Sequence, residues 1–101
     1  MAKAPSRVMQ PFRDNAEKLR YELDEGEDLI RADYRDGPGG VRALTHFETP
    51  PEARGKGAAG RLMTAILAEA RASGRKLQAR CSYAVDYLER HPDAGDVLAG
   101  A

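Results

Sequence analysis

The sequence predicts one α+β domain in which a small, mostly antiparallel mixed sheet packs against a long helix. Apolar residues alternate with charged ones from Leu19 to Leu23, which is typical of a strand with one buried face. The run Asp36-Gly37-Pro38-Gly39-Gly40 is rich in turn formers and separates two further strand-like segments. Between residues 62 and 70, apolar side chains recur with helical spacing, so a helix joins this sheet.

The strands before the helix are expected to form an antiparallel meander. The first covers Leu19 to Leu23 and is closed by a tight turn at residues 24–27. The second runs from about Asp28 to Arg35. After the glycine-rich turn, the third strand returns alongside over Val41 to Glu48.

The second half of the chain supplies the helix and one more strand. The predicted helix covers Gly57 to Ser73, and Gly74 ends it. Lys76 to Cys81 make a fourth strand. The crossover from the third strand through the helix is expected to be right-handed and to make the last two strands parallel. Ser82 can then cap a short C-terminal helix over Tyr83 to Arg90.

Composition limits the class of protein. The 101 residues suffice for one domain with a modest core, which we place at residues 11–101, after an N-terminal arm of residues 1–10 that we expect to be disordered. The 16 basic and 16 acidic residues cancel, so charge favours neither nucleic acid nor an anionic membrane as a partner. A single cysteine excludes an internal disulfide and suits a reducing compartment. The lack of a long apolar segment predicts a soluble, cytoplasmic protein.

The strongest functional signal lies immediately before the long helix. Gly55 and Gly57 lack side chains, so an anion can approach the backbone closely there. The first turn of the helix adds unpaired N–H groups and the positive end of the helix dipole. Arg54 and Lys56 add positive charge. A flexible loop capped by glycine is the alternative interpretation, but Pro50-Pro51 upstream favours a rigid loop that binds a pyrophosphate.

Two common nucleotide motifs fit this loop poorly. Residues 55–60 match the dinucleotide pattern G-x-G-x-x-G, yet that pattern requires a strand leading directly into the first glycine and an acidic residue about twenty positions later. Here two prolines intervene, and the strand after the helix carries no such acid. The Walker pattern fails because Arg61 and Leu62 follow Gly60, where lysine and a hydroxyl residue are required.

A third pattern fits better. It consists of arginine or glutamine, two residues of any type, glycine, one residue of any type, and then glycine or alanine. Arg54, Gly57 and Ala59 match its three fixed positions. It resembles the acetyl-CoA pyrophosphate loop of the GNAT superfamily of N-acetyltransferases. The chain is similar to short, single-domain GNAT-like proteins over roughly residues 14–98, because further blocks follow the family's order: Thr45 to Pro50, Cys81-Ser82-Tyr83, Tyr87 and Arg90-His91-Pro92. Ala58 departs from the pattern, since such loops often carry a larger aliphatic residue there.

This resemblance implies a minimal GNAT-like fold and acetyl-CoA as the cofactor. The pyrophosphate would bind the loop and the helix start, Arg54, Gly55, Lys56, Gly57, Ala58, Ala59 and Gly60. The pantetheine arm in this superfamily runs beside the strand before the loop, which implies backbone hydrogen bonds from Phe47, Glu48 and Thr49. Tyr83 or Tyr87 would protonate the departing thiolate, as a tyrosine often does in relatives; the alternative is that both are partly buried aromatic residues of an amphipathic helix.

Two reactive side chains are expected at one edge of the predicted sheet. His46 lies near the end of the third strand and Cys81 ends the fourth, so parallel pairing brings both to the carboxyl edge, where α/β proteins bind ligands. In one role, His46 deprotonates Cys81, which carries the acetyl group as a thioester. In the other, His46 or a water that it orients is a general base for direct attack by the amine, and Cys81 only lines the cleft. The family resemblance favours direct transfer, while a lone cysteine is also often a small buried hydrophobe.

The predicted function is transfer of acetyl from acetyl-CoA to an unidentified amine, either a small molecule or a protein. A chain this short lacks the extra elements with which longer relatives build an acceptor pocket, so the acceptor binds an open surface or a partner completes the site. The alternatives are a non-catalytic acyl-CoA-binding or protein-interaction module and a thioester hydrolase that uses Cys81 and His46. No metal is expected, because His46, Cys81 and His91 lack the close spacing of zinc ligands. The oligomeric state is left open.

Overall fold

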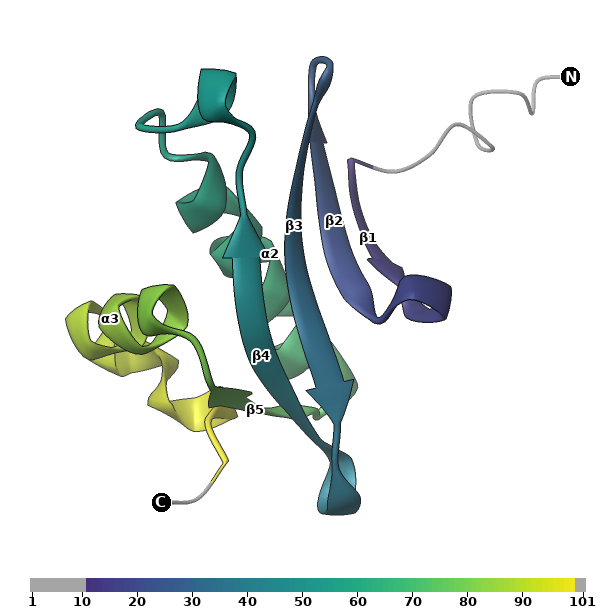
Figure 1. The fold of residues 1–101 in the computed structure, drawn as a ribbon. Coiled ribbons are helices and arrows are strands. Elements are labelled where there is room, and N and C mark those ends of the chain that lie inside the picture. The colour runs from purple at the N-terminus through teal and green to yellow at the C-terminus, as the bar shows by residue number, and fades with distance from the viewer. Residues whose placement is uncertain (1–10, 100–101) are drawn as a thin grey trace, which may run out of the picture.

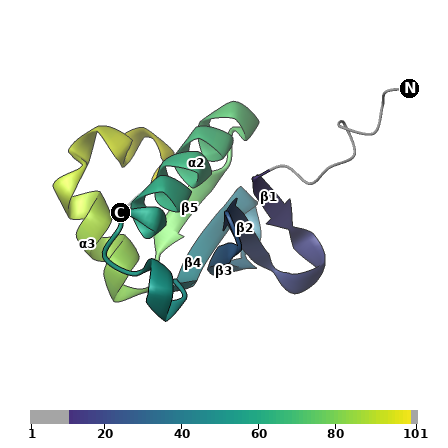
Figure 2. The same ribbon diagram turned by 90° about the horizontal axis from the view of Figure 1, so that it is seen from above.

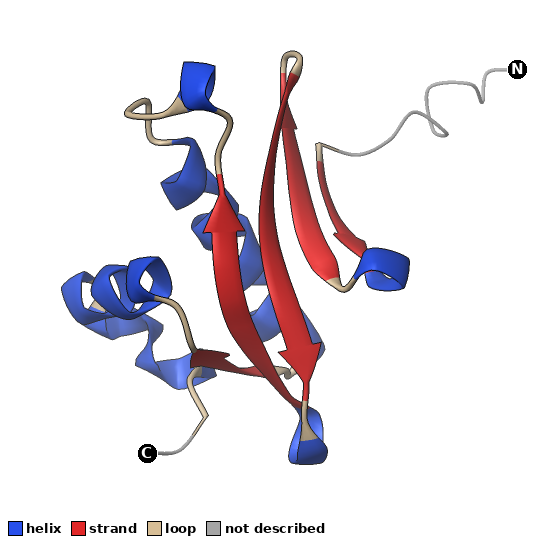
Figure 3. Cartoon of the chain, viewed as in Figure 1, coloured by secondary structure: helices blue, strands red, loops and turns tan. Residues whose placement is uncertain are grey.

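A five-stranded sheet organises residues 11–99, which are the residues that this computed structural model describes (Figure 1). The predicted N-terminal arm, residues 1–10, lies outside that range. The strands are β1 (Phe12–Asn15), β2 (Arg20–Glu25), β3 (Asp28–Asp36), β4 (Val41–Glu48) and β5 (Lys76–Ala79). The helices are α2 (Ala58–Ser73) and α3 (Ser82–Arg90), and short 3-10 turns occupy Ala16–Lys18, Pro38–Gly40, Pro51–Ala53 and Pro92–Val97 (Figure 3).

The strands lie in chain order, and only the last pair is parallel among the described strands. β4 and β5 pair in parallel from Val41↔Lys76 to Leu44↔Ala79, and α2 forms the crossover between them. Viewed from above, α2 runs along one face of the sheet and α3 lies on the β4–β5 side (Figure 2). The predicted meander, the long helix and the parallel last pair are therefore confirmed.

The sheet differs from the prediction at its two edges. β1 was not expected, because it contains four residues and two of them are charged; it pairs antiparallel with β2. Leu19 was expected to begin a strand but ends the turn before β2, with a left-handed φ of 54° and 43% of its surface exposed. β5 ends at Ala79 rather than Cys81.

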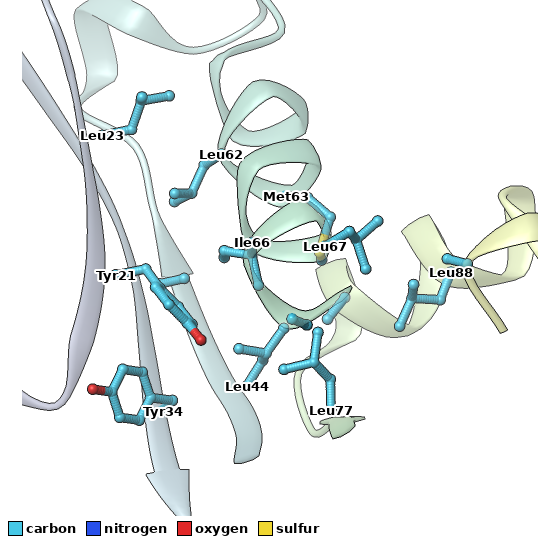
Figure 4. Close-up of a cluster of buried hydrophobic side chains, with 14 of the residues drawn as sticks. Tyr21, Leu23, Tyr34, Leu44, Leu62, Met63, Ile66, Leu67, Leu77 and Leu88 are labelled. Carbon is cyan, nitrogen blue, oxygen red and sulfur yellow. The ribbon is translucent and has the colours of Figure 1, made fainter. Parts of the chain in front are cut away.

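The buried face of α2 fixes the position of the helix on the sheet (Figure 4). The helix buries Ala58, Leu62, Met63, Ile66, Leu67 and Ala70. These side chains belong to one core cluster with Tyr21, Leu23, Ile30, Ala32, Tyr34 and Leu44 of the sheet. Burying one large aliphatic side chain stabilises a fold by about 1.5–3 kcal/mol, so this face holds the helix strongly. No helix in residues 11–99 is long and apolar enough to cross a membrane.

Arg42 of β4 is a buried charge in this core, with 5% of its surface exposed. Its guanidinium lies 3.6 Å from the centroid of the Tyr34 ring. Its Nη1 is 2.9 Å from Oδ2 of Asp14, and its Nε is 2.5 Å from Oδ1 of Asp36. The Tyr34 hydroxyl donates to Asp14 as well. The charge is thus compensated by two carboxylates and an aromatic face, as a buried cation requires.

Tyr21 extends this network from the sheet to α2. Its hydroxyl accepts a hydrogen bond from Arg42 at 3.1 Å and donates to Glu69 of the helix at 3.2 Å. Burial raises the pKa of Tyr21 to about 12, so the hydroxyl keeps its proton and can donate. The network joins β1, β2, β3 and β4 to the helix near its last turns.

A β-bulge in β4 changes the face on which its last residues lie. Leu44 pairs with Tyr34 and His46 pairs with Asp33, so Thr45 is the extra residue; its Oγ1 donates to the Asp33 carbonyl at 3.2 Å. Directly opposed residues share a face of an antiparallel sheet. Phe47, which follows the bulge, therefore packs on the core, while His46 turns to the outer face, opposite α2.

Candidate functional site

The predicted pyrophosphate loop ends in a helix start that has no side-chain cap. Gly55 and Gly57 have left-handed backbone angles, with φ of 77° and 83°, and Lys56 between them is exposed. Gly57 is the N-cap of α2 and makes no side-chain hydrogen bond to the first turn. Arg61 N–H donates to the Gly57 carbonyl at 3.0 Å, so the N–H groups of residues 58–60 precede the helical ladder. These three donors are suited to an external anion.

A cavity of about 250 Å³ lies at this helix start. It is lined by Thr49, Ala53, Arg54, Gly55, Gly57, Ala58, Ala59, Gly60 and Tyr83. A Cβ atom at Gly55 would meet nothing within 4 Å, whereas one at Gly57 would lie 3.1 Å from Nη1 of Arg61. Cavities of about 390 and 420 Å³ lie along β5 and α3 and on the outer sheet face. Among these three cavities, the one of about 250 Å³ contains the backbone N–H donors of a helix start.

Two arginines lie near the start of α2, and acceptors at the same end of the sheet hold both of them. Arg54 follows β4, and its Nε donates to the Thr49 carbonyl at 2.9 Å while its Nη2 lies 3.6 Å from Oε2 of Glu48. Arg61 lies in the first turn of α2 and pairs with both oxygens of Glu25, at 2.6 and 2.8 Å. Arg61 was not among the predicted site residues. Its position four residues after Gly57 was the available signal, because such residues share a helix face.

The strand segment predicted to contact pantetheine has an open edge. β5 pairs with β4 only as far as Leu44, and the last recorded bond between them is from Arg80 N–H to the Leu44 carbonyl at 2.9 Å. Phe47 and Glu48 pair with β3 on the other side. In the described part of the chain, the β5-facing edge of β4 after Leu44 thus has no strand partner, and the cavity begins at Thr49.

His46 lies on the outer face with 53% of its side chain exposed. Its Nε2 is 2.8 Å from Oε1 of Glu48, two residues along the same strand. That hydrogen bond holds the pKa of the Glu48 carboxyl below its usual value, and the charges of His46, Arg31 and Arg54 add to the effect. The carboxylate can only accept, so when the imidazole is neutral its proton lies on Nε2 and Nδ1 carries the lone pair.

Cys81 follows β5 and is half-buried against the core. Its Sγ accepts a hydrogen bond from Ala84 N–H at 3.4 Å, so Cys81 is the N-cap of α3, and the expectation that Ser82 caps this helix was wrong. His46 and Cys81 both follow the paired part of β4 and β5. Their side chains have different partners, however, and in residues 11–99 no hydrogen bond joins them.

The two candidate tyrosines, Tyr83 and Tyr87, have different neighbours in α3 and at the cavity. The Tyr83 ring packs 4.9 Å from the Phe47 ring centroid and lines the cavity, and a Cβ atom at Gly60 would lie 3.8 Å from its hydroxyl. Burial raises the pKa of Tyr83, which favours the protonated phenol. Tyr87 instead stacks on His91, with 3.9 Å between ring centroids. Tyr83 is therefore the tyrosine nearer the helix start.

Comparison with known proteins identifies the family. Residues 20–97 match the model of the GCN5-related N-acetyltransferases, and the chain belongs to this family. The fold is similar to the solution NMR structure of a GCN5-like protein from Staphylococcus aureus, with a TM-score of 0.69 and 25% sequence identity over 92% of this chain and 93% of that one. A search of curated proteins finds no match. The resemblance inferred from the glycine loop and the GNAT-like fold are thus confirmed.

The cap of α3 yields a prediction about Cys81. Cys81→Ser keeps an acceptor for Ala84 N–H, so we expect a melting temperature close to that of the wild type. Cys81→Ala removes the acceptor and should cost up to about 1 kcal/mol of unfolding free energy, the typical value for loss of an oxygen cap, because sulfur is a weaker acceptor. Thermal unfolding measures the melting temperature, and urea unfolding measures the free energy.

The neighbouring serine is the matched control. Ser82 is the first residue of α3 rather than its cap, so Ser82→Ala should leave the unfolding free energy nearly unchanged. If Ser82→Ala destabilised the protein more than Cys81→Ala, the cap would be assigned to the wrong residue.

Proposed function

We propose that this protein is an N-acetyltransferase that uses acetyl-CoA and transfers its acetyl group to an amine. The observation that carries the proposal is the uncapped start of α2, where N–H groups follow two left-handed glycines and open into a cavity. Such a helix start binds phosphates through its unpaired donors and its dipole. The family to which the chain belongs makes acetyl transfer the chemistry to test first.

The residues at the cavity fit the parts of CoA. Backbone N–H groups of Ala58, Ala59 and Gly60 would bind the pyrophosphate, with Arg54 and Lys56 adding positive charge. The open edge of β4 at Phe47 and Glu48, with Thr49 just beyond the strand, would hydrogen-bond the pantetheine arm. Bound acetyl-CoA supplies a thioester whose carbonyl carbon is the electrophile.

Direct transfer is the route that the side-chain contacts support. Neutral His46 would carry its lone pair on Nδ1, where it can accept a proton from the amine or from an intervening water. Tyr83 lines the cavity as a protonated phenol and can donate to the departing thiolate. The Cys81 sulfur accepts a hydrogen bond from Ala84 N–H, and no hydrogen bond in residues 11–99 joins it to His46, so the acyl-cysteine route has less support.

Binding of CoA is the first prediction of this proposal. CoA and acetyl-CoA should raise the melting temperature, by an amount equivalent to about 2.7 kcal/mol at a hundred times the dissociation constant, whereas NAD should not. Arg54→Ala should weaken binding by about 1.5–3 kcal/mol, the range for hydrogen bonds that involve charged groups. Gly57→Asp should abolish binding, because its carboxylate would lie beside the phosphate donors. Isothermal titration calorimetry measures each affinity.

Gly74 provides the matched control at the other end of α2. It has a similar left-handed φ of 76°, so Gly74→Asp imposes comparable backbone strain far from the cavity. We expect Gly74→Asp to lower stability and leave CoA affinity unchanged. Equal loss of affinity in both variants, or tight binding of NAD, would contradict the assignment of the loop.

The route of transfer is tested with acetyl-CoA and a panel of amines. For direct transfer we expect no acetylated protein by mass spectrometry in the absence of an amine, activity retained in Cys81→Ala, and kcat lowered about 10²-fold or more in His46→Gln. A stable acetyl adduct that is lost in Cys81→Ser and passes to an amine would establish the covalent route instead. Binding without turnover would favour the non-catalytic module, and turnover without an amine would favour thioester hydrolysis.

A further inference from the structure

Glu48 at the end of β4 is shared by two side chains with different predicted roles. Its Oε1 accepts a hydrogen bond from Nε2 of His46 at 2.8 Å, and its Oε2 lies 3.6 Å from Nη2 of Arg54. His46 is the candidate base, whereas Arg54 lines the cavity at the start of α2. One carboxylate therefore links the candidate base to the cation of the phosphate loop.

The backbone places these three residues together for identifiable reasons. The bulge at Thr45 turns His46 to the outer face, and Glu48 follows two positions later on the same face. Arg54 is brought back towards the strand by the proline-initiated turn Pro51–Ala53 and by its hydrogen bond to the Thr49 carbonyl. The contact between Arg54 and Glu48 is longer than a hydrogen bond, so this arginine can exchange Glu48 for a stronger anion.

We propose that Glu48 is a positioning residue that orients His46 and increases its basicity, and that Arg54 competes for the same carboxylate until a pyrophosphate engages it. This inference rests on the proposed function. When an anion in the cavity attracts Arg54, Glu48 loses one cationic partner and its charge acts more fully on the imidazole. The cofactor site would thus increase the strength of the base only when the cofactor is bound.

Other charged groups surround His46 and set the background for this effect. On β3, Asp33 lies directly opposite His46 and pairs with Arg31 at 3.2 Å. Arg80 and Cys81 follow β5 on the other side. Glu48 makes the hydrogen bond to the imidazole, so its removal should have the largest effect of any single neutralisation. Because the partners are partly exposed, the effect of each single substitution is expected to be modest.

The experiment is an NMR titration of the two histidines of the full chain between pH 4 and 9. His91 is an internal control, since its Nδ1 hydrogen-bonds the Tyr87 carbonyl within α3 rather than a carboxylate. In the free protein, Glu48→Gln should lower the titration midpoint of His46, and Arg54→Gln should raise it. In the Glu48→Gln background the effect of Arg54→Gln should shrink, because the carboxylate that transmits it is gone. The midpoint of His91 should stay constant in every variant.

Titration with saturating CoA then tests the coupling. CoA should raise the His46 midpoint in both proteins, because the negative phosphates act directly on the imidazole in each. The rise should be larger in the wild type than in Glu48→Gln, because only the wild type has the carboxylate that Arg54 releases. An unchanged His46 midpoint in Glu48→Gln, or an Arg54→Gln shift of equal size with and without Glu48, would overturn the inference. Absence of CoA binding would refute the proposed function, while the free-protein titrations would still decide the role of Glu48.

Discussion

The crossover of α2 between β4 and β5 sets the position of both the core and the candidate site. A helix that joins two parallel strands must begin near the carboxyl end of the first, so the core contacts of Leu62, Ile66 and Ala70 also decide where the helix starts. The buried network of Arg42, Tyr21 and Glu69 ties the later turns of α2 to the same sheet. The start of the helix is left uncapped and faces a cavity, and the proposed cofactor site is a consequence of this arrangement.

The second local constraint is the bulge at Thr45. Without the extra residue, simple alternation would place His46 on the core face with Leu44. With it, Phe47 packs against Tyr83 on the side of α3, and the pair of His46 and Glu48 lies on the outer face. This divides the end of β4 into an aromatic side, next to the cavity, and a polar side that carries the candidate base.

Secondary structure that follows from a local pattern in the sequence was predictable. Strand pairing, side-chain orientation and salt bridges that depend on residues far apart in the chain were not. Helical spacing in residues 58–73 and the turn formers between β3 and β4 led to the correct meander and crossover. β1 contains only four residues and is defined by its pairing with β2, so no local period indicates it. The outward turn of His46 depends on the register between β3 and β4, and the cap of Cys81 depends on where β5 stops. The salt bridge between Arg61 and Glu25 joins residues 36 positions apart, which local spacing cannot indicate.

The proposed function requires that phosphate groups of CoA bind the first turn of α2. The most direct measurement is a titration of the ¹⁵N-labelled protein with CoA, followed through its backbone amide signals. We expect the largest chemical-shift changes at Ala58, Ala59 and Gly60, with small changes at Gly74 at the far end of the same helix. Changes confined to the other cavities, near Arg80 on the outer face or Leu98 beside β5, would contradict it.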